Sequence, residues 1–277
     1  MTSLRRLFLA PGAAVLLVTL AAPLAIVCAY SVLSRGAYGG VEPPYTVENY
    51  TLLFTPLYTR IFVRSFAMAM AATVLCVVLG FPLALFIARS RRRALYLGLV
   101  ILPFWSSFLI RMYAWIFLLR DTGLINTVLQ RLHITAAPLP MLYNNGAVLL
   151  GLVYGYLPFA VLPLYAVVER VARQDRALLE AAADLGASPG AVFWKVMAPL
   201  CLPGIRAAAL LVFVPCLGTY LVSDLLGGSK TVLIGNVIQN QFTASRDWPF
   251  GAALSMVMVL AMLALLSGAR RGGEELV

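Results

Sequence analysis

Six long charge-poor runs constrain the fold of this chain more than any other feature. A helix needs about 20 residues to cross the roughly 30 Å hydrocarbon layer of a membrane. The runs are continuous rather than alternating, which favours helices over barrel strands. With 62% hydrophobic and 12% charged residues, the chain is predicted to be an all-α polytopic membrane protein with six transmembrane helices. The runs lie at about 10–33, 65–88, 94–119, 146–168, 204–223 and 249–269, and Arg111 interrupts the third.

The basic residues follow the loops between these runs. With six spans they fall on one side, and because short basic loops stay in the cytoplasm, both termini are predicted to be cytoplasmic. The net charge of +10 does not indicate nucleic acid, because no basic face is interleaved with base-stacking aromatics. The residues concerned are Arg5, Arg6, Arg89, Arg91, Arg92, Arg93, Arg170, Arg173, Arg176, Lys195, Arg270 and Arg271.

The first run follows two arginines and has to be distinguished from a signal peptide. It is longer than the usual apolar core of about 7–15 residues, and Val27 before Cys28 is bulky for a cleavage or lipidation site. An uncleaved anchor is therefore expected. The expected organisation is an anchor helix with an outer loop at 1–60, a membrane core of five helices at 61–270 and a tail at 271–277.

Catalytic and cofactor motifs are missing from the sequence. GGSKT at 227–231 resembles the end of a phosphate-binding loop, but that loop needs Gly before Lys230, where Ser229 stands. The single His133 cannot build a metal site. The four cysteines, which have no Cys-x-x-Cys spacing, are expected to be packing residues (Cys28, Cys76, Cys201 and Cys216). The chain is expected to be neither an enzyme nor a nucleotide binder, so any ATP is handled by another subunit.

Two short patterns carry less weight. Asn49-Tyr50-Thr51 is formally a glycosylation triplet in an outer loop, although such triplets arise often by chance. Gly151 and Gly155 lie one turn apart in the fourth run, which lets another helix approach closely. Packing within the bundle is favoured over a dedicated subunit contact.

The segment at about 175–203 is polar and lies between two apolar runs. Asp175 is expected to cap a first helix and Gly186 to end it in the left-handed conformation. Ser188 then caps a second short helix with Pro189 at its first position. The first helix has an apolar face at helical spacing, formed by Leu178, Ala181, Ala182 and Leu185. A helix, a sharp turn and a second helix are predicted, and these residues alone leave open a surface-lying amphipathic loop.

This segment resembles the EAA loop of ABC importer permeases. Glu180, Ala181, Ala182, Gly186 and Pro199 match that pattern in spacing, whereas Val196 stands for Ile and Ala198 for Leu. The resemblance implies the type I importer permease fold, with a coupling helix that docks in a groove of a separate ATPase subunit. The implied coupling residues are Glu180, Ala181, Ala182, Asp184, Gly186, Ser188, Pro189 and Pro199.

Further blocks at 64–73, 103–115, 178–188 and 220–253 resemble the PotB-type permease subunits of spermidine/putrescine importers. The resemblance implies a bacterial inner-membrane protein that moves a polyamine across the membrane. It also implies three partners: a second, PotC-like permease, a PotA-like ATPase dimer that holds ATP and Mg, and a periplasmic PotD-like polyamine-binding protein. No cofactor is implied for this chain.

A polycation needs acids and aromatic faces along its pathway. Tyr220 and Asp224 are the strongest candidates, because their spacing predicts one helical face and a carboxylate at the edge of a span needs a partner. The other candidates are Trp105, Tyr113, Asp247 and Trp248. The three aromatics among these are also explained as interface or packing residues, and Asp247 as a helix cap or a partner of Arg246.

Arg111 does not fit a pathway for cations, because a positive charge in the third run repels a polyamine. An acidic partner, helix-end carbonyls and a docked binding protein all remain open as explanations. Function keeps two alternatives: a permease for another solute, such as an opine-like amino compound, iron or thiamine, and a secondary transporter or channel acting alone.

Overall fold

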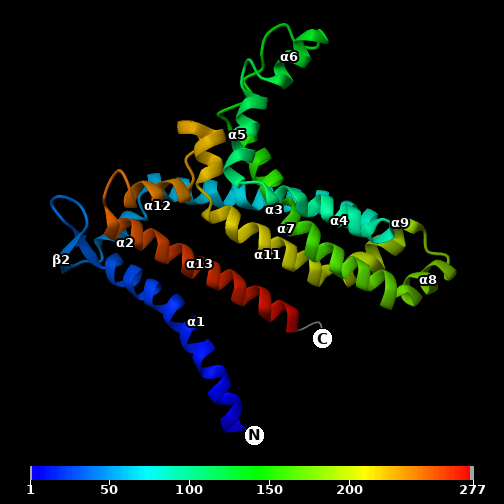
Figure 1. The fold of residues 1–277 in the computed structure, drawn as a ribbon, viewed down its shortest axis with the longest axis horizontal. Helices are drawn as coiled ribbons and strands as arrows, with labels where there is room; N and C mark the ends of the chain where they lie inside the picture. The colour runs from blue at the N-terminus through cyan, green and yellow to red at the C-terminus, as the bar shows by residue number, and fades with distance from the viewer. Residues whose placement is uncertain (1, 275–277) are drawn as a thin grey trace. The chain divides into compact units, whose positions relative to one another are not determined.

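The computed structural model describes residues 2–274, and helices make up most of them (Figure 1). It divides into two compact units, one formed by Met1–Arg60 and Val237–Leu265 and the other by Ile61–Asn236 and Leu266–Val277. The first unit is called here the terminal unit and the second the core unit.

Among the described residues, four helices are long and apolar enough to cross a membrane, and the number rises to six if each of two bent helix pairs is one span. The four are α1 (Thr2–Ser31), α3 (Pro56–Arg89), α7 (Asn145–Gln174) and α13 (Trp248–Glu274). The first bent pair comprises α4 (Arg93–Ile101) with the 3-10 turn η1 (Leu102–Trp105), followed by α5 (Phe108–Leu119) and α6 (Leu124–Arg131). The second comprises α9 (Pro189–Val192), the π-helical turn η2 (Phe193–Met197) and α10 (Ala198–Leu200), followed by α11 (Leu202–Gly218).

The third predicted span is not a continuous helix, which corrects the expectation for 94–119. The chain turns by 90° between η1 and α5. Ser106 is extended there, with φ −96° and ψ 150°, and its carbonyl oxygen accepts a hydrogen bond of 3.0 Å from the Arg111 guanidinium. A side chain therefore satisfies a backbone group that a continuous helix would pair internally.

The fifth span also breaks earlier than the run 204–223 predicts. The helix α11 ends at Gly218, and after a short irregular stretch the chain enters the π-helical turn η3 (Ser223–Gly227) and the 3-10 turn η4 (Gly228–Lys230). Asn236 holds this break together: its Nδ2 donates to the Tyr220 carbonyl at 3.2 Å, and its Oδ1 accepts from Ser223 Oγ at 2.5 Å. The Asp224 N–H donates to the Tyr220 carbonyl at 2.9 Å, so the two residues lie one helical turn apart after the break, as their spacing predicts.

The terminal unit contains the two strands of this mostly helical chain that the structure describes, an exception to the all-α prediction. Strands β1 (Leu33–Arg35) and β2 (Val41–Tyr45) pair in antiparallel fashion and are followed by α2 (Glu48–Leu52). Asn49 is buried, and its Nδ2 donates to the carbonyls of Ser31 and Leu33 at 3.0 and 2.9 Å. Its amide therefore secures the hairpin and is not presented for glycosylation.

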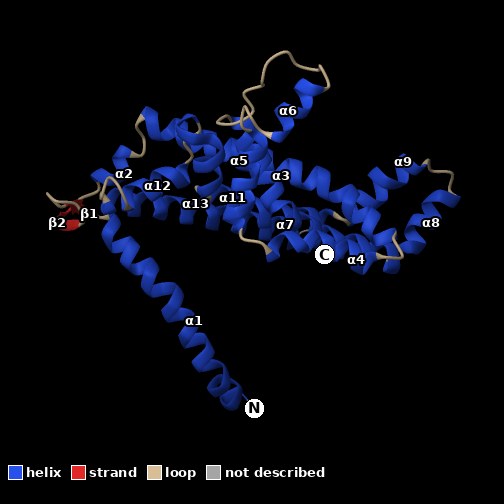
Figure 2. Ribbon diagram, turned by 45° about the horizontal axis from the view of Figure 1, so that its top comes forward, coloured by secondary structure: helices blue, strands red, loops and turns tan. Residues whose placement is uncertain are grey.

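Helices α7 and α11 lie side by side in the core unit, with α8 (Arg176–Asp184) and α9 together at one end of the pair (Figures 1 and 2). Glycine permits this approach, because a Cβ on Gly204 would lie 2.7 Å from Val167 Cγ2. The helix α12 (Ile234–Phe242) begins where its first backbone N–H donates to Ser65 Oγ at 2.8 Å. This hydrogen bond links α12 to α3.

Gly151 and Gly155 of α7 also pack within the core unit. A Cβ on Gly151 would lie 2.8 Å from Val222 Cγ1, and one on Gly155 would lie 2.9 Å from Phe108 Cε2. Both glycines therefore make room for neighbouring segments of the same chain. The prediction of packing within the bundle is confirmed.

Candidate transport cavity and coupling loop

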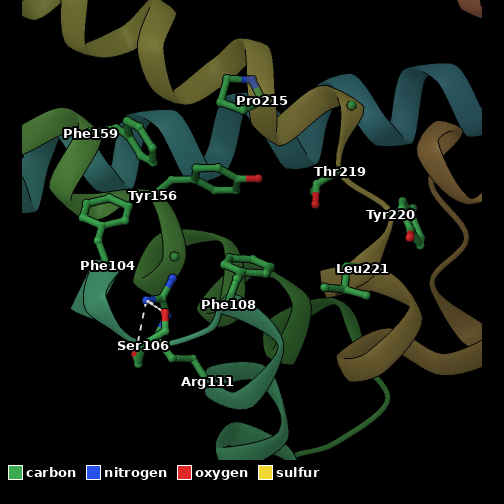
Figure 3. Close-up of a pocket in the computed structure, with 12 residues that line it drawn as sticks. Phe104, Ser106, Phe108, Arg111, Tyr156, Phe159, Pro215, Thr219, Tyr220 and Leu221 are labelled. Carbon is green, nitrogen blue, oxygen red and sulfur yellow. Dashed lines mark hydrogen bonds between the residues drawn. The ribbon is translucent and has the colours of Figure 1, made fainter. Parts of the chain in front are cut away.

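A cavity of about 710 Å³ lies in the core unit, between η1, α5, α7 and the end of α11. Five of its twelve lining residues are aromatic (Figure 3). Phe104 and Phe159 meet edge to face with centroids 5.1 Å apart, and Tyr156 lies 6.0 Å from Phe159 and 6.4 Å from Phe108. These four rings, Phe104, Phe108, Tyr156 and Phe159, are called here the aromatic end of the cavity.

Arg111 lines the aromatic end and is only 9% exposed. Its NH1 donates to the carbonyl oxygen and the hydroxyl of Ser106 at 3.0 and 3.4 Å (Figure 3). The guanidinium carbon stands 5.9 Å from the ring centre of Phe104 and 5.5 Å from that of Phe108, within cation-π range. Nε is buried without a hydrogen-bond partner among the described residues, and no described carboxylate forms an ion pair with this side chain.

Of the three explanations for Arg111, helix-end carbonyls are the one that the contacts bear out. The bond to the Ser106 carbonyl replaces the one lost at the break before α5. Burying a cation within a membrane span costs free energy, and these contacts offset only part of that cost.

The opposite end of the cavity is formed by the break after α11. Thr219, Tyr220 and Leu221 line it, together with Pro215 and Gly218. Tyr220 is thus the one predicted pathway residue in the described cavity wall. This end is called here the tyrosine end.

The other five predicted pathway residues lie elsewhere. Asp224 is exposed but outside the wall, as are Trp105, which is 88% exposed, and Tyr113. In the terminal unit, Asp247 Oδ1 accepts from the backbone N–H of Phe250 at 3.2 Å and so caps α13, while Oδ2 lies 4.0 Å from Arg35 rather than pairing with Arg246. Trp248 stacks on Tyr30 with centroids 6.4 Å apart. All five remain predictions as pathway residues.

The sequence reasoning missed Phe104, Phe108, Tyr156 and Phe159. In a continuous apolar run, the spacing of the residues does not distinguish an aromatic side chain that lines a cavity from one that is packed in the core. Gly155 was a usable signal, because a glycine one turn from aromatic residues marks a place where a ring can approach the backbone closely.

The predicted coupling loop has the expected shape. The helix α8 ends in a Schellman motif, in which Gly186 has φ +83° and its N–H bonds to the Ala183 carbonyl at 2.9 Å. Ala187 N–H closes the motif on the Ala182 carbonyl at 3.1 Å. Ser188 Oγ then accepts from Ala191 N–H at 3.3 Å, with Pro189 at the first position of α9.

One cap differs from the prediction. Asp175 stands at the N-cap of α8, but its side chain makes no capping hydrogen bond. It has φ −100° and ψ 16° rather than the extended backbone from which a carboxylate reaches the second or third N–H.

The loop presents both charged and apolar side chains outward. Glu180, Ala181, Asp184, Ser188, Pro189 and Pro199 are exposed, and Ala182 is half-buried. Leu185 is 89% exposed and Trp194 is 72% exposed. The loop is attached to the bundle by Phe193, which meets Phe81 of α3 edge to face at 5.7 Å. An exposed apolar surface on an anchored helical element suits docking to another protein.

A membrane core with broken spans and an anchored polar helix pair fits the importer permease class that the resemblance implies, and the comparisons agree. The chain belongs to the family described as binding-protein-dependent transport system inner membrane component, whose model matches residues 76–269. It is an integral membrane permease subunit of an ABC importer.

The similar proteins are more specific. The spermidine/putrescine transport system permease protein PotB of Haemophilus influenzae is 43% identical over 246 residues, covering 88% of this chain and 85% of that protein. PotB of Escherichia coli K12 is 44% identical over 234 residues, covering 84% of each. A solved bacterial alginate ABC transporter, in complex with a periplasmic protein that holds an alginate pentasaccharide, has a TM-score of 0.75 at 16% identity, covering 99% of this chain and 94% of that one. This last match shows the fold alone.

Proposed function

We propose that this chain carries polyamines, with spermidine and putrescine as the first candidates. The observation that supports this most is the 43–44% identity to permeases of that name over 84–88% of the chain. The matched length is large enough to include both the cavity and the loop. The Tyr220 ring in the cavity wall adds physical support, because ring faces attract organic cations.

The proposed complex has three further components. A second, PotC-like permease completes the pathway, a PotA-like ATPase dimer holds ATP and Mg, and a periplasmic PotD-like protein delivers the polyamine. This chain is then a non-catalytic subunit without a cofactor, in the bacterial inner membrane, with six spans and cytoplasmic termini. The family description, which makes transport dependent on a binding protein, supports this assembly.

Energy enters through the coupling loop. Its exposed face at Glu180, Ala181 and Asp184 docks on the ATPase, and the small Ala181 and Ala182 permit close approach. The Gly186 turn and the Ser188 cap keep the two helices at a fixed angle, so the loop moves as a rigid body when the ATPase closes. The substrate passes Tyr220, with Asp224, Trp105, Tyr113, Asp247 and Trp248 as further pathway candidates.

A direct test is uptake of radiolabelled spermidine and putrescine by the reconstituted four-component complex. Uptake that needs both the binding protein and ATP hydrolysis is expected. A complex assembled with an ATPase variant that cannot hydrolyse ATP is the matched control. Uptake that persists with this variant and without the binding protein would instead indicate a channel or secondary transporter.

Arg111 favours one alternative substrate class. A guanidinium in the cavity wall suits a solute with a carboxylate, such as an opine-like amino compound. A competition assay distinguishes polyamines from carboxylate-bearing amino compounds as the substrate. Unlabelled amino compounds should leave the uptake of radiolabelled polyamine unchanged if polyamines are the substrate. Inhibition by them, together with their own ATP-driven uptake, would favour the alternative.

A further inference from the structure

The wall of the cavity carries the positively charged Arg111 at the aromatic end, which is the part best suited to bind an organic cation. The aromatic end consists of four rings, and proteins bind organic ammonium groups with such clusters of ring faces. The Arg111 guanidinium already stands over two of these rings, Phe104 and Phe108. An ammonium group of a substrate and this guanidinium would therefore compete for the same ring faces.

The guanidinium is held in place rather than left free in the cavity. Its NH1 is bonded to both oxygens of Ser106, at the break before α5. The side chain is buried, and no described carboxylate neutralises it. Its charge therefore acts on whatever enters the cavity.

The effect of this charge on a bound ammonium group is large. At an effective dielectric constant near 20, a second cation about 6 Å from the guanidinium is held roughly 100-fold less tightly than without it. A flexible polyamine reduces this penalty by moving its charged groups away. The ring faces near Arg111 then remain unoccupied by the substrate's ammonium groups.

Building on the proposed polyamine function, we propose that Arg111 is a specificity-determining and positioning residue that prevents the aromatic end from trapping the polyamine. Its charge directs the substrate's ammonium groups to the tyrosine end, where the Thr219 hydroxyl and the Tyr220 ring offer weaker contacts. Transport needs a site that binds the substrate and also releases it. Arg111 supplies that balance, because its charge lowers the affinity for polyamine at the aromatic end, where contacts with the rings would otherwise make it high.

The test is equilibrium binding of radiolabelled spermidine and putrescine to the assembled permease–ATPase complex in lipid nanodiscs. R111Q should bind spermidine about 10- to 100-fold more tightly than the wild type, with a smaller gain for putrescine, which carries fewer charges. Maximal uptake by the complete importer should fall, because release becomes slow. R111K keeps the charge and should retain the affinity of the wild type.

Two further variants separate charge from structure. S106D places a carboxylate beside the guanidinium, neutralises it in situ, and should raise affinity as R111Q does. R120Q is the matched control, because Arg120 also stacks on a ring of α5, 4.5 Å from Phe117, but lies outside the cavity wall. It should bind polyamine like the wild type.

The outcomes are distinct. An unchanged or weaker affinity of R111Q, or an R111K that behaves like R111Q, would overturn the role of the charge. If R111Q does not assemble, S106D decides in the same way, and an unchanged affinity overturns the proposal. Failure of the wild-type importer to take up polyamine refutes the proposed function, whereas normal wild-type uptake with unaltered R111Q affinity refutes the role of Arg111 alone.

Discussion

Gly186 provides a sharp test of the coupling loop, because its structural role can be separated from packing. It has φ +83° at the turn between α8 and α9, and a Cβ built on it would meet nothing within 4 Å. Any cost of a side chain at this position therefore comes from the backbone conformation and not from a clash. The turn keeps the two helices of the loop at their mutual angle.

The magnitude follows from that geometry. An L-residue in the left-handed region costs roughly 1–2 kcal/mol, and Val lies at the upper end because its branched Cβ tolerates this region least. Since each 1.4 kcal/mol corresponds to a factor of ten, the native turn should become about 5- to 30-fold less favoured relative to alternative turns. Asn tolerates the left-handed region and should cost little.

The assay is ATP-driven uptake in proteoliposomes with equal amounts of each variant inserted, together with ATP hydrolysis. Uptake should decrease in the order Gly, Asn, Ala, Val at position 186, with Gly186→Val close to zero. Gly190→Ala is the matched control, because Gly190 lies in the same loop, has no left-handed φ, and has open space around its Cβ position. It should transport like the wild type.

The result that refutes this reasoning is normal uptake by Gly186→Val. An Asn variant as defective as the Val variant would also contradict it, since the defect would then not depend on the left-handed conformation. Equal damage from Gly190→Ala would show that the loop is sensitive to any added side chain.

Three further changes test other parts of the chain. Glu180→Lys should leave the chain inserted but abolish ATP-driven uptake and co-purification of the ATPase; retention of both would exclude a docking role. Asp224→Asn should reduce polyamine uptake more than it reduces assembly of the complex, and unaltered uptake kinetics would remove Asp224 from the pathway. Gly151→Leu should lower stability by about 1–3 kcal/mol through overpacking against Val222, and an unchanged melting temperature would contradict the close packing of α7.

The coupling loop was predictable from sequence because the interactions that shape it are local. Ser188 bonds three residues ahead, and Gly186 is required by the conformation of a single residue. The matching EAA pattern adds an ATPase subunit as the partner of the loop, which stays a prediction. Asp175 shows the limit of such reasoning, since a capping residue type at the right position does not ensure the backbone angles that capping needs.

The cavity was not predictable because its parts depend on contacts between distant segments. Hydropathy shows one continuous apolar run across the break before α5. It cannot show that the Arg111 guanidinium donates to the Ser106 carbonyl in place of a lost backbone N–H. The break between Gly218 and Tyr220 was hidden from the sequence for a similar reason. Asn236, 16 residues beyond Tyr220, binds its carbonyl and helps fix the break there.

Coupling loop and cavity are connected by one helix, which gives a physical route for the proposed transmission. The helix α11 begins at Leu202, directly after the loop, and ends at Gly218, beside the tyrosine end. Its 17 residues span about 25 Å at 1.5 Å per residue. Gly204 lets the first turn of α11 pack closely against α7 near Val167. Further along the helix, the Phe213 ring meets Phe66 of α3 with centroids 5.2 Å apart. We expect a displacement of the loop to move α11 as one rigid helix, whose far end carries the Thr219–Tyr220 wall. Docking of the ATPase would therefore change the width of the cavity at the end to which Arg111 directs the substrate.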